Sequence, residues 1–285
     1  MTVHDAFENL KGKLELPDRR RAEAAAAQEE LRERISRHLD VPRSFLTGSY
    51  SRYTKLHPLN DIDVFLVRNN QRVGLVTDGS GTMPGVALDE VETAVRRAYP
   101  SATTKRQSRS INVEVPGVAF GFDLVPAWYR SPNGYWIPDA DNGRWLPTDP
   151  ERHGIALTAA NERSGGKLIP LVKMAKHWSR QNYDLFRSFH LELICQQVIQ
   201  APVESWQIGM ARVLVGLQAH VGQQMLDPVY EVSRVDKELS AEEYGQLLTR
   251  VQSDAASAIK ALELEVARDH AGAVEKWRRI FLSGF

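Results

Sequence analysis

The sequence has very little cysteine: Cys195 is the only one among 285 residues. A single cysteine excludes an internal disulfide and a cysteine-rich zinc site. Because Cys195 follows the apolar residues Leu193 and Ile194, we expect a buried core thiol rather than a nucleophile. The eight histidines are scattered along the chain, without the short paired spacings that zinc ligands have.

Long apolar runs and an excess of charge are also missing. No stretch approaches the ~20 apolar residues of a membrane-spanning helix, and the N-terminal MTVHDAFENLKGK lacks the apolar core of a signal peptide. The 36 basic and 36 acidic residues cancel, whereas proteins that coat long nucleic acids usually carry a basic excess. We therefore expect a cytoplasmic protein that spans no membrane and binds no long nucleic acid stably.

The first half of the chain has a mixed α/β pattern. The periodicity predicts helices over Pro17–Leu39 and Val86–Tyr99, and strands over Ser44–Thr47, Ile62–Val67, Ile111–Val115 and Val118–Val125. The last two strands flank Pro116-Gly117, which predicts a hairpin. Glycine and proline predict a loop over residues 74–85. Residues 128–150 are dense in Trp, Pro, Gly and Asp and predict a long ordered loop or a domain crossover.

The second half of the chain is helical in character. Apolar stripes predict helices over Lys167–Gln181, Phe189–Gln200, Glu204–Met225, Glu242–Asp269 and Ala273–Phe281. The change of pattern near residue 150 divides the chain into a mixed α/β domain with an N-terminal helix, residues 1–150, and a helical domain, residues 151–285.

The most informative stretch begins at Asp61. Alternate residues of a strand project from one face, so Asp61 and Asp63 point the same way while Ile62 points into the core. Two carboxylates that are neighbours on one face of a strand repel each other unless a cation lies between them. Mg²⁺ prefers oxygen ligands and usually binds through one or two carboxylates plus substrate phosphates. The alternative is that both aspartates simply face water at the edge of a sheet. The apolar run after Asp63 argues against this alternative.

A Gly48-Ser49 pair precedes this strand, separated from it by the eleven residues Tyr50–Asn60. A Gly-Ser turn after a short strand lets backbone N–H groups approach a phosphate, and the serine hydroxyl adds a donor. The spacer suffices for one helical turn and a return into the next strand. The pair, the spacer and the Asp61–Asp63 strand together form a more specific signal than any of them alone.

Asp123 is the third carboxylate of interest. It lies in the otherwise apolar stretch AFGFDLVPAW, where an unpaired carboxylate would cost on the order of several kcal/mol. We expect its hairpin to lie beside the Asp61–Asp63 strand and to bring three carboxylates together. Two-metal catalysis needs such a cluster, with metals ~3.5–4 Å apart. A salt bridge inside the sheet, with Arg106 or Arg109, is the alternative.

These residues together resemble the DNA polymerase β-like nucleotidyltransferase superfamily, whose signature is a Gly-Ser turn, a spacer, a DxD strand and a distal aspartate. More narrowly, the chain resembles the cGAS/DncV-like nucleotidyltransferases (CD-NTases) of bacterial antiphage signalling. The narrower resemblance is carried by the stretches WLPTDP with His153, LVKMAKHW and SFHLE. It extends from about residue 44 to 195, and no element of the motif is missing.

The resemblance implies an α+β fold with a polymerase β-like core, which is a mixed sheet with flanking helices, and a C-terminal helical domain that closes a nucleotide cleft. It implies that Asp61, Asp63 and Asp123 are the catalytic and metal-binding residues, holding two Mg²⁺ ions that Mn²⁺ can replace. The nucleotide-binding residues that it implies are Gly48, Ser49, Lys176, Ser188 and Phe189.

The chemistry of these side chains suits the implied roles. Lys176 gives a point charge for a triphosphate and Ser188 a short neutral donor, while stacking of Phe189 on a base is worth ~1–3 kcal/mol. Without the resemblance, Lys176 is one of several lysines on an amphipathic helix, with Lys173 as its competitor, and Phe189 is a core residue. The basic residues Lys105, Arg106 and Arg109 either line an acceptor pocket or form a solvated edge.

The implied activity is the joining of NTPs into a cyclic oligonucleotide second messenger, with a cyclic dinucleotide expected, pyrophosphate released and a separate effector protein reading the product. The alternative is a template-independent terminal nucleotidyltransferase that acts on RNA, of the CCA-adding or poly(A) type, against which the neutral net charge argues modestly. A non-enzymatic nucleotide sensor predicts the loss of a carboxylate, and none is lost.

Overall fold

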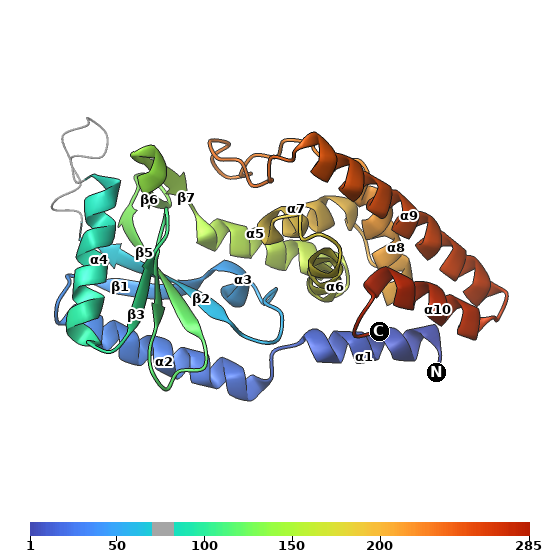
Figure 1. Cartoon of the computed structure of the whole chain (residues 1–285), viewed down its shortest axis with the longest axis horizontal. Helices are drawn as coiled ribbons and strands as arrows, with labels where there is room; N and C mark the ends of the chain where they lie inside the picture. The colour runs from blue at the N-terminus through green and yellow to red at the C-terminus, as the bar shows by residue number, and fades with distance from the viewer. Residues whose placement is uncertain (70–82) are drawn as a thin grey trace. The chain divides into compact units, whose positions relative to one another are not determined.

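The computed structural model describes residues 1–69 and 83–285, and the chain divides into two compact units (Figure 1). The sheet unit comprises Leu16–Tyr53 and Pro58–Gly154. The helical unit comprises Met1–Glu15, Thr54–His57 and Ile155–Phe285. The boundary expected after residue 150 is close to the break after Gly154, but two segments from the first part of the chain belong to the helical unit.

The described part of the sheet unit contains a seven-stranded mixed sheet with helices beside it. The strand order is β1-β2-β5-β4-β3, with β6 paired to β5 and β7 paired to β6. Only β2 and β5 run parallel among the described pairs. The strands are β1 Arg43–Thr47, β2 Asp61–Arg68, β3 Thr103–Arg106, β4 Ile111–Glu114, β5 Gly121–Tyr129, β6 Tyr135–Asp139 and β7 Arg144–Thr148. The helices are α2 Asp18–Ser36, α3 Gly48–Ser51, α4 Pro84–Ala98 and the 3-10 helix η2 Ala140–Asn142.

The side chains of β2 alternate between two cores. Ile62, Val64 and Leu66 are buried in a cluster that also contains residues of α2 and α4, which Figure 1 shows beside the sheet. Phe65 and Val67 are buried in a second cluster on the other face, which includes residues of β5, β6 and β7. Burial on both faces confirms what the apolar run of this strand predicts.

The second cluster covers only part of its face of β2. Asp61 and Asp63 share that face with Phe65 and Val67, because they are separated from them by even numbers of residues. Both aspartates lie at the beginning of the strand and stay partly exposed. The apolar end of the strand therefore packs in the core of the sheet unit, while the two aspartates at its beginning stay accessible to a ligand.

Of the two predictions for residues 128–150, a long ordered loop or a domain crossover, the loop is wrong. β5 continues to Tyr129, and β6 and β7 then form an antiparallel hairpin closed by η2. Tyr135 and Ile137 are buried in the cluster around Phe65, so packing outweighs the low strand propensity of the local proline and glycine.

The hairpin predicted around Pro116-Gly117 is confirmed as β4 and β5. The loop expected over 74–85 lies largely outside the described residues, and Pro84 already begins α4.

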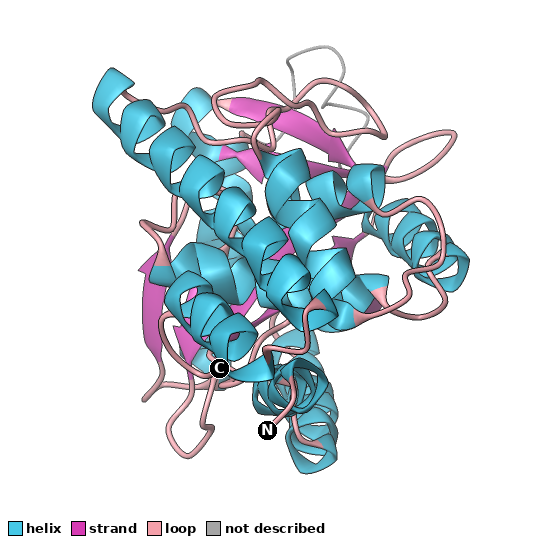
Figure 2. Cartoon of the chain, turned by 90° about the vertical axis from the view of Figure 1, so that its right-hand side faces the viewer, coloured by secondary structure: helices cyan, strands magenta, loops and turns pink. Residues whose placement is uncertain are grey.

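The helical unit contains all five of the predicted helices with adjusted bounds, and Figure 2 shows its helices in cyan. They are α6 Leu168–Gln181, α7 Ser188–Val198, α8 Trp206–Leu217, α9 Ala241–Val266 and α10 His270–Phe281. Cys195 is fully buried among them, as expected, and burial raises the pKa of its thiol to about 12. Among the helices of the described residues, each is too short or too polar to cross a membrane.

Two further helices were not expected, α1 Val3–Leu14 in the helical unit and α5 Pro150–Arg163, which begins in the sheet unit and continues into the helical unit. α1 begins with a capping box: Thr2 Oγ1 accepts from the N–H of Asp5 at 3.1 Å, and Asp5 Oδ2 accepts from the N–H of Thr2 at 2.9 Å. Phe7 is fully buried, with its ring centroid 4.9 Å from those of Trp277 and Phe285. This aromatic packing explains why the first fifteen residues belong to the helical unit.

His190 of α7 makes the stability of this unit depend on pH. Its side chain is only 3% exposed, and none of the residues that the structure describes gives its Nε2 a hydrogen-bond partner. Burial lowers the pKa of the imidazole to about 4; Asp236 opposes this effect, while His220 and Arg187 add to it. Because the folded-state pKa lies below the unfolded-state value of about 6.5, the unfolded chain binds more protons between these values. Stability is therefore full above about pH 6.5 and falls as the pH drops toward 4.

Between pH 6.5 and 4, the free energy of unfolding of the parent should fall by up to about 3 kcal/mol because of His190. We expect His190→Leu to lack this part of the fall. Urea titrations at a series of pH values measure it. His270→Gln, at an exposed histidine of α10, is the matched control and should keep the pH dependence of the parent. If His190→Leu keeps it too, the assignment to His190 is wrong.

Candidate active site

A row of polar side chains crosses five strands of the sheet. The register of β1 and β2 places Thr47 opposite Asp63, and that of β2 and β5 places Asp63 opposite Asp123. β4 continues the row with Asn112 opposite Asp123, and β3 with Lys105 opposite Asn112. Because paired residues project from the same face of a sheet, these five side chains, the polar row, share one face.

The three predicted carboxylates lie at this row. Asp61 is two residues before Asp63 and on the same face, and the residue opposite it on β5 is Gly121, which adds no side chain. Neighbouring strands are about 4.8 Å apart, so Asp63 and Asp123 are direct neighbours although they come from different parts of the chain. The expectation that the hairpin lies beside the Asp61–Asp63 strand is confirmed.

Gly48 packs directly against Asp63. Its φ of +67° is in the left-handed region, which favours glycine. A Cβ at this position would overlap with the carboxylate of Asp63, since it would lie 2.6 Å from the carboxyl carbon. Gly48 and Ser49 begin α3, the single helical turn that the spacer predicts. The Gly-Ser turn and the first acidic pair therefore form one packed site.

Asp123 is held by two amide side chains that the sequence patterns did not single out. Asn112 Nδ2 donates to Asp123 Oδ1 at 2.9 Å, and Gln107 Nε2 donates to the same oxygen at 3.3 Å. The signal for Asn112 was its polar side chain in the apolar strand sequence INV, which the hairpin register aligns with Asp123. Arg106, considered as a salt-bridge partner of Asp123, instead pairs with Asp89 and donates to the carbonyl of Gly85 at 2.9 Å.

The donor set of the three carboxylates suits a magnesium ion, although no closed cage is present. Over residues 1–69 and 83–285, no group of three or more His, Cys, Asp or Glu side chains is arranged to hold a metal. Mg²⁺ usually takes only one or two carboxylates from a protein and completes its shell with water and substrate phosphates. Asp61, Asp63 and Asp123 offer hard oxygen ligands of this kind, so they fit a site that is completed by substrate.

The other predicted residues are in the helical unit. Lys176 is 3% exposed, and its Nζ donates to Glu192 Oε1 at 2.6 Å and to Thr54 Oγ1 at 3.0 Å. Lys173, its competitor in the sequence, is also buried and pairs with Glu15. Ser188 is the first residue of α7 and is exposed, and Phe189 is partly exposed. The predicted site residues thus come from both units.

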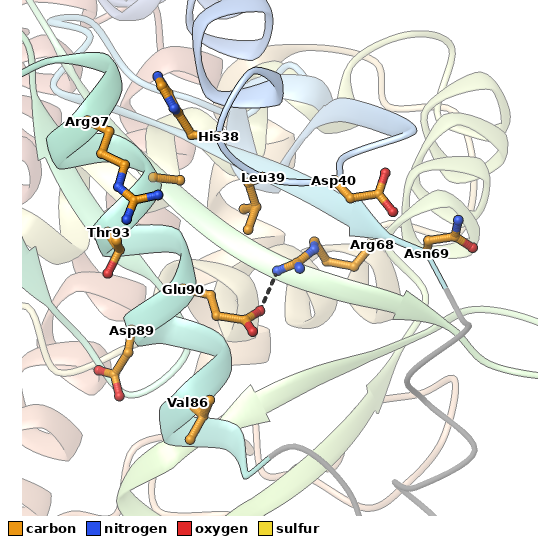
Figure 3. Close-up of a pocket in the computed structure, with 11 residues that line it drawn as sticks. His38, Leu39, Asp40, Arg68, Asn69, Val86, Asp89, Glu90, Thr93 and Arg97 are labelled. Atoms are coloured by element: carbon orange, nitrogen blue, oxygen red, sulfur yellow. Dashed lines mark hydrogen bonds and ion pairs between the residues drawn. The ribbon is translucent and has the colours of Figure 1, made fainter.

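A pocket of about 610 Å³ lies elsewhere in the sheet unit (Figure 3). Arg68 and Glu90 form a 2.9 Å ion pair in its wall. Arg68 ends β2 while Asp61 begins it, so at ~3.3 Å per residue Arg68 lies roughly 23 Å along the strand from Asp61 and roughly 17 Å from Asp63. None of the predicted site residues lines the pocket. The lining residues are His38, Leu39, Asp40, Arg68, Asn69, Val86, Asp89, Glu90, Thr93, Ala94 and Arg97.

Comparison with known proteins gives a family for the chain. Residues 1–161 match the model of the Second Messenger Oligonucleotide or Dinucleotide Synthetase domain. A curated relative, the cyclic AMP-AMP-AMP synthase of an Acinetobacter species, is 27% identical over 309 aligned residues, which cover 100% of this chain and 86% of the relative.

Two solved structures share the fold along nearly the whole chain. CdnC of Escherichia coli MS115-1, solved with ATP, has a TM-score of 0.76 and 21% identity, covering 99% of this chain and 98% of that chain. The CD-NTase CdnG of Bradyrhizobium diazoefficiens, solved with GTP, has a TM-score of 0.76 and 17% identity, covering 96% and 97%. The chain therefore belongs to the Second Messenger Oligonucleotide or Dinucleotide Synthetase family of nucleotidyltransferases, as its resemblance to the CD-NTases predicts.

Proposed function

We propose that this protein joins NTPs into a cyclic oligonucleotide second messenger and releases pyrophosphate. The observation that carries the proposal is the pairing of Asp63 with Asp123 across β2 and β5, with Gly48 against the Asp63 carboxylate. Nucleotidyl transfer with metal ions needs acidic ligands beside a turn that admits a phosphate. Membership of a family of second-messenger synthetases supports the same reaction.

The residues of the sheet unit would orient the donor nucleotide. Asp61 and Asp63 would hold the triphosphate through a shared metal, and Asp123 would complete the ligand set of a second. Two bound Mg²⁺ ions would supply positive charge at the transferring phosphoryl group and lower the pKa of the attacking hydroxyl. The absent side chain of Gly48 would let the backbone approach the triphosphate, and the hydroxyl of Ser49 would donate to it.

The residues of the helical unit would add contacts to the nucleotide. Ser188 and Phe189 are accessible enough to bind a phosphate and to stack on a base. Lys176 is different, because its ammonium group already donates to Glu192 and Thr54. As a triphosphate contact it would have to exchange the Glu192 carboxylate for a phosphate oxygen.

The product would be read by a separate effector protein in antiphage defence in the bacterial cytoplasm. The sequence motifs led us to expect a cyclic dinucleotide, whereas the Acinetobacter relative is named for a cyclic trinucleotide. Both rings arise from the same transfer step, repeated a different number of times before closure.

The proposal is tested by incubating pure protein with each NTP alone and with mixtures, in Mg²⁺ or Mn²⁺, and by identifying the products by mass spectrometry. The expected result is a cyclic product of two or three nucleotides, formed without RNA and resistant to phosphatase because a ring has no terminal phosphate. Extension of added RNA, with no product from NTPs alone, would instead favour the terminal transferase alternative and overturn the proposal.

Asp63→Asn should reduce product formation by more than about a hundredfold. Mutation of an outer-shell residue that supports a metal ligand lowers activity about 10- to 100-fold, and loss of the ligand itself should lower it at least as much. Initial rates at saturating Mg²⁺ measure the effect, and a thermal melt checks the fold. The control is Asp141→Asn, at an exposed aspartate of η2, which should keep the parent rate; an active Asp63→Asn enzyme would refute the catalytic assignment.

Gly48→Ala should lower activity at least about tenfold, because its methyl group would displace the Asp63 carboxylate and a misplacement of about 1 Å costs about a hundredfold. Gly117→Ala separates this effect from backbone strain. Gly117 also has a positive φ, +87°, but no atom of the described residues lies within 4 Å of an added Cβ. Both variants should lose about 1–2 kcal/mol of stability, and only Gly48→Ala should lose activity. Equal activities would contradict the packed site.

Glu192→Gln should destabilise the protein by about 3–5 kcal/mol, because it leaves the buried ammonium of Lys176 without this carboxylate. Urea unfolding at pH 7 measures the change. Glu204→Gln removes the exposed carboxylate that pairs with Arg212 at 3.1 Å, and should leave the stability close to that of the parent, because water already screens this pair. If Glu192→Gln has the same free energy of unfolding as the parent, the Lys176–Glu192 pair is not a buried structural contact.

A further inference from the structure

We infer that Asn112 and Gln107 are positioning residues that orient the carboxylate of Asp123 toward a metal ion. The inference rests on the proposed function, because it gives the two amides a role in a metal-dependent site. Neither residue belongs to the Gly-Ser turn or to the acidic residues that define the family resemblance. Both belong to the β3–β4 hairpin of the sheet unit.

The two amides converge on one atom. Asn112 lies opposite Asp123 in the β4–β5 register, and its Nδ2 donates to Oδ1 at 2.9 Å. Gln107 comes from the turn that joins β3 to β4, and its Nε2 donates to the same Oδ1 at 3.3 Å. Two donors from different directions on one oxygen restrict rotation of the carboxylate, so they set the direction of both of its oxygens.

The orientation of the Gln107 amide is itself determined by its neighbours. Ser110 Oγ donates to Gln107 Oε1 at 2.7 Å, so the amide oxygen faces Ser110 and the NH₂ group faces Asp123. The backbone closes the same turn, since the N–H of Gln107 donates to the carbonyl of Ser110 at 2.9 Å. An amide flip would place two donors against the serine hydroxyl and an oxygen against the carboxylate.

The turn is anchored at its other side to the end of β6. Ser108 Oγ donates to Asp139 Oδ1 at 3.0 Å, and the carbonyl of Ser108 accepts from the N–H of Ala140 at 2.8 Å. Asp139 is buried and also accepts from Asn142 and Arg144. The turn is thus held at two successive residues, with Ser108 bonded to the β6–β7 hairpin and Gln107 bonded to Asp123. Outer-shell residues support metal ligands in this way.

The chemical type of the two donors fits a cation site. An amide stabilises a carboxylate without adding a positive charge, whereas an arginine at the same place would neutralise it and repel a metal ion. The nearby Arg106 is held by Asp89 and by the carbonyl of Gly85. The two amides of the hairpin therefore support Asp123 without adding charge, and Arg106 is engaged with α4.

The test compares Asn112→Leu and Gln107→Leu with the parent in two measurements. One is the Mg²⁺ concentration that gives half-maximal product formation. The other is binding of Mn²⁺ in the presence of a nonhydrolysable ATP analogue, followed by electron paramagnetic resonance, which needs no turnover. Thr104→Val is the matched control, because it removes a 2.8 Å hydroxyl–carboxylate bond to Glu92 from the same hairpin.

Asn112→Leu should weaken Mn²⁺ binding and raise the half-saturating Mg²⁺ concentration by about 10- to 100-fold, with the KM for NTP at saturating Mg²⁺ little changed. Gln107 is exposed, so its variant should lose only about threefold, the effect of one weak hydrogen bond. Thr104→Val should bind Mn²⁺ like the parent.

Parent-like Mn²⁺ binding in Asn112→Leu would overturn the inference. If a thermal melt shows that Asn112→Leu does not fold, Gln107→Leu tests the inference instead. A Mn²⁺ affinity of Gln107→Leu equal to that of the parent would then overturn the inference. A parent protein that binds Mn²⁺ but forms no product from NTPs would refute the proposed reaction and leave this comparison intact, so the two failures are distinguishable.

Discussion

The parallel pairing of β2 with β5 is the constraint on which the rest of the sheet unit depends. It places Asp63 beside Asp123 and leaves Asp61 opposite a glycine, which concentrates negative charge at one end of two buried strands. Like charges on neighbouring strands repel, so this arrangement must be maintained by the surrounding structure. The apolar remainder of β2, buried in one cluster with α2 and α4 and in another with β6 and β7, supplies that support.

Three neighbours of the carboxylates, Gly48, Asn112 and Gln107, carry no charge. Gly48 contributes only backbone against Asp63, and Asn112 and Gln107 contribute only amide donors to Asp123. Such neighbours orient an anion without cancelling its charge. Under the proposed function, such neighbours would leave the acidic residues their affinity for the metal ions that nucleotidyl transfer uses.

In the helical unit, several buried charges are paired directly with an opposite charge. Lys176 with Glu192 and Lys173 with Glu15 are ion pairs whose lysines are almost fully buried. Asp254, whose carboxyl pKa is raised by burial, accepts from the indole of Trp178 at 2.7 Å and from Arg250. Desolvation makes each unpaired partner costly, so these pairs hold their helices in one arrangement.

Much of the molecule was determined by sequence alone. The Gly48-Ser49 turn, the Asp61–Asp63 strand, the Pro116-Gly117 hairpin, the C-terminal helices and the family all followed from local patterns, because turn chemistry and periodicity act over a few residues. The β6–β7 hairpin, the place of α1 against Trp277, the amide support of Asp123 and the pairing of Lys176 with Glu192 were decided by tertiary structure. Each of these depends on contacts between segments far apart in the chain, and burial against a distant partner outweighs local propensity.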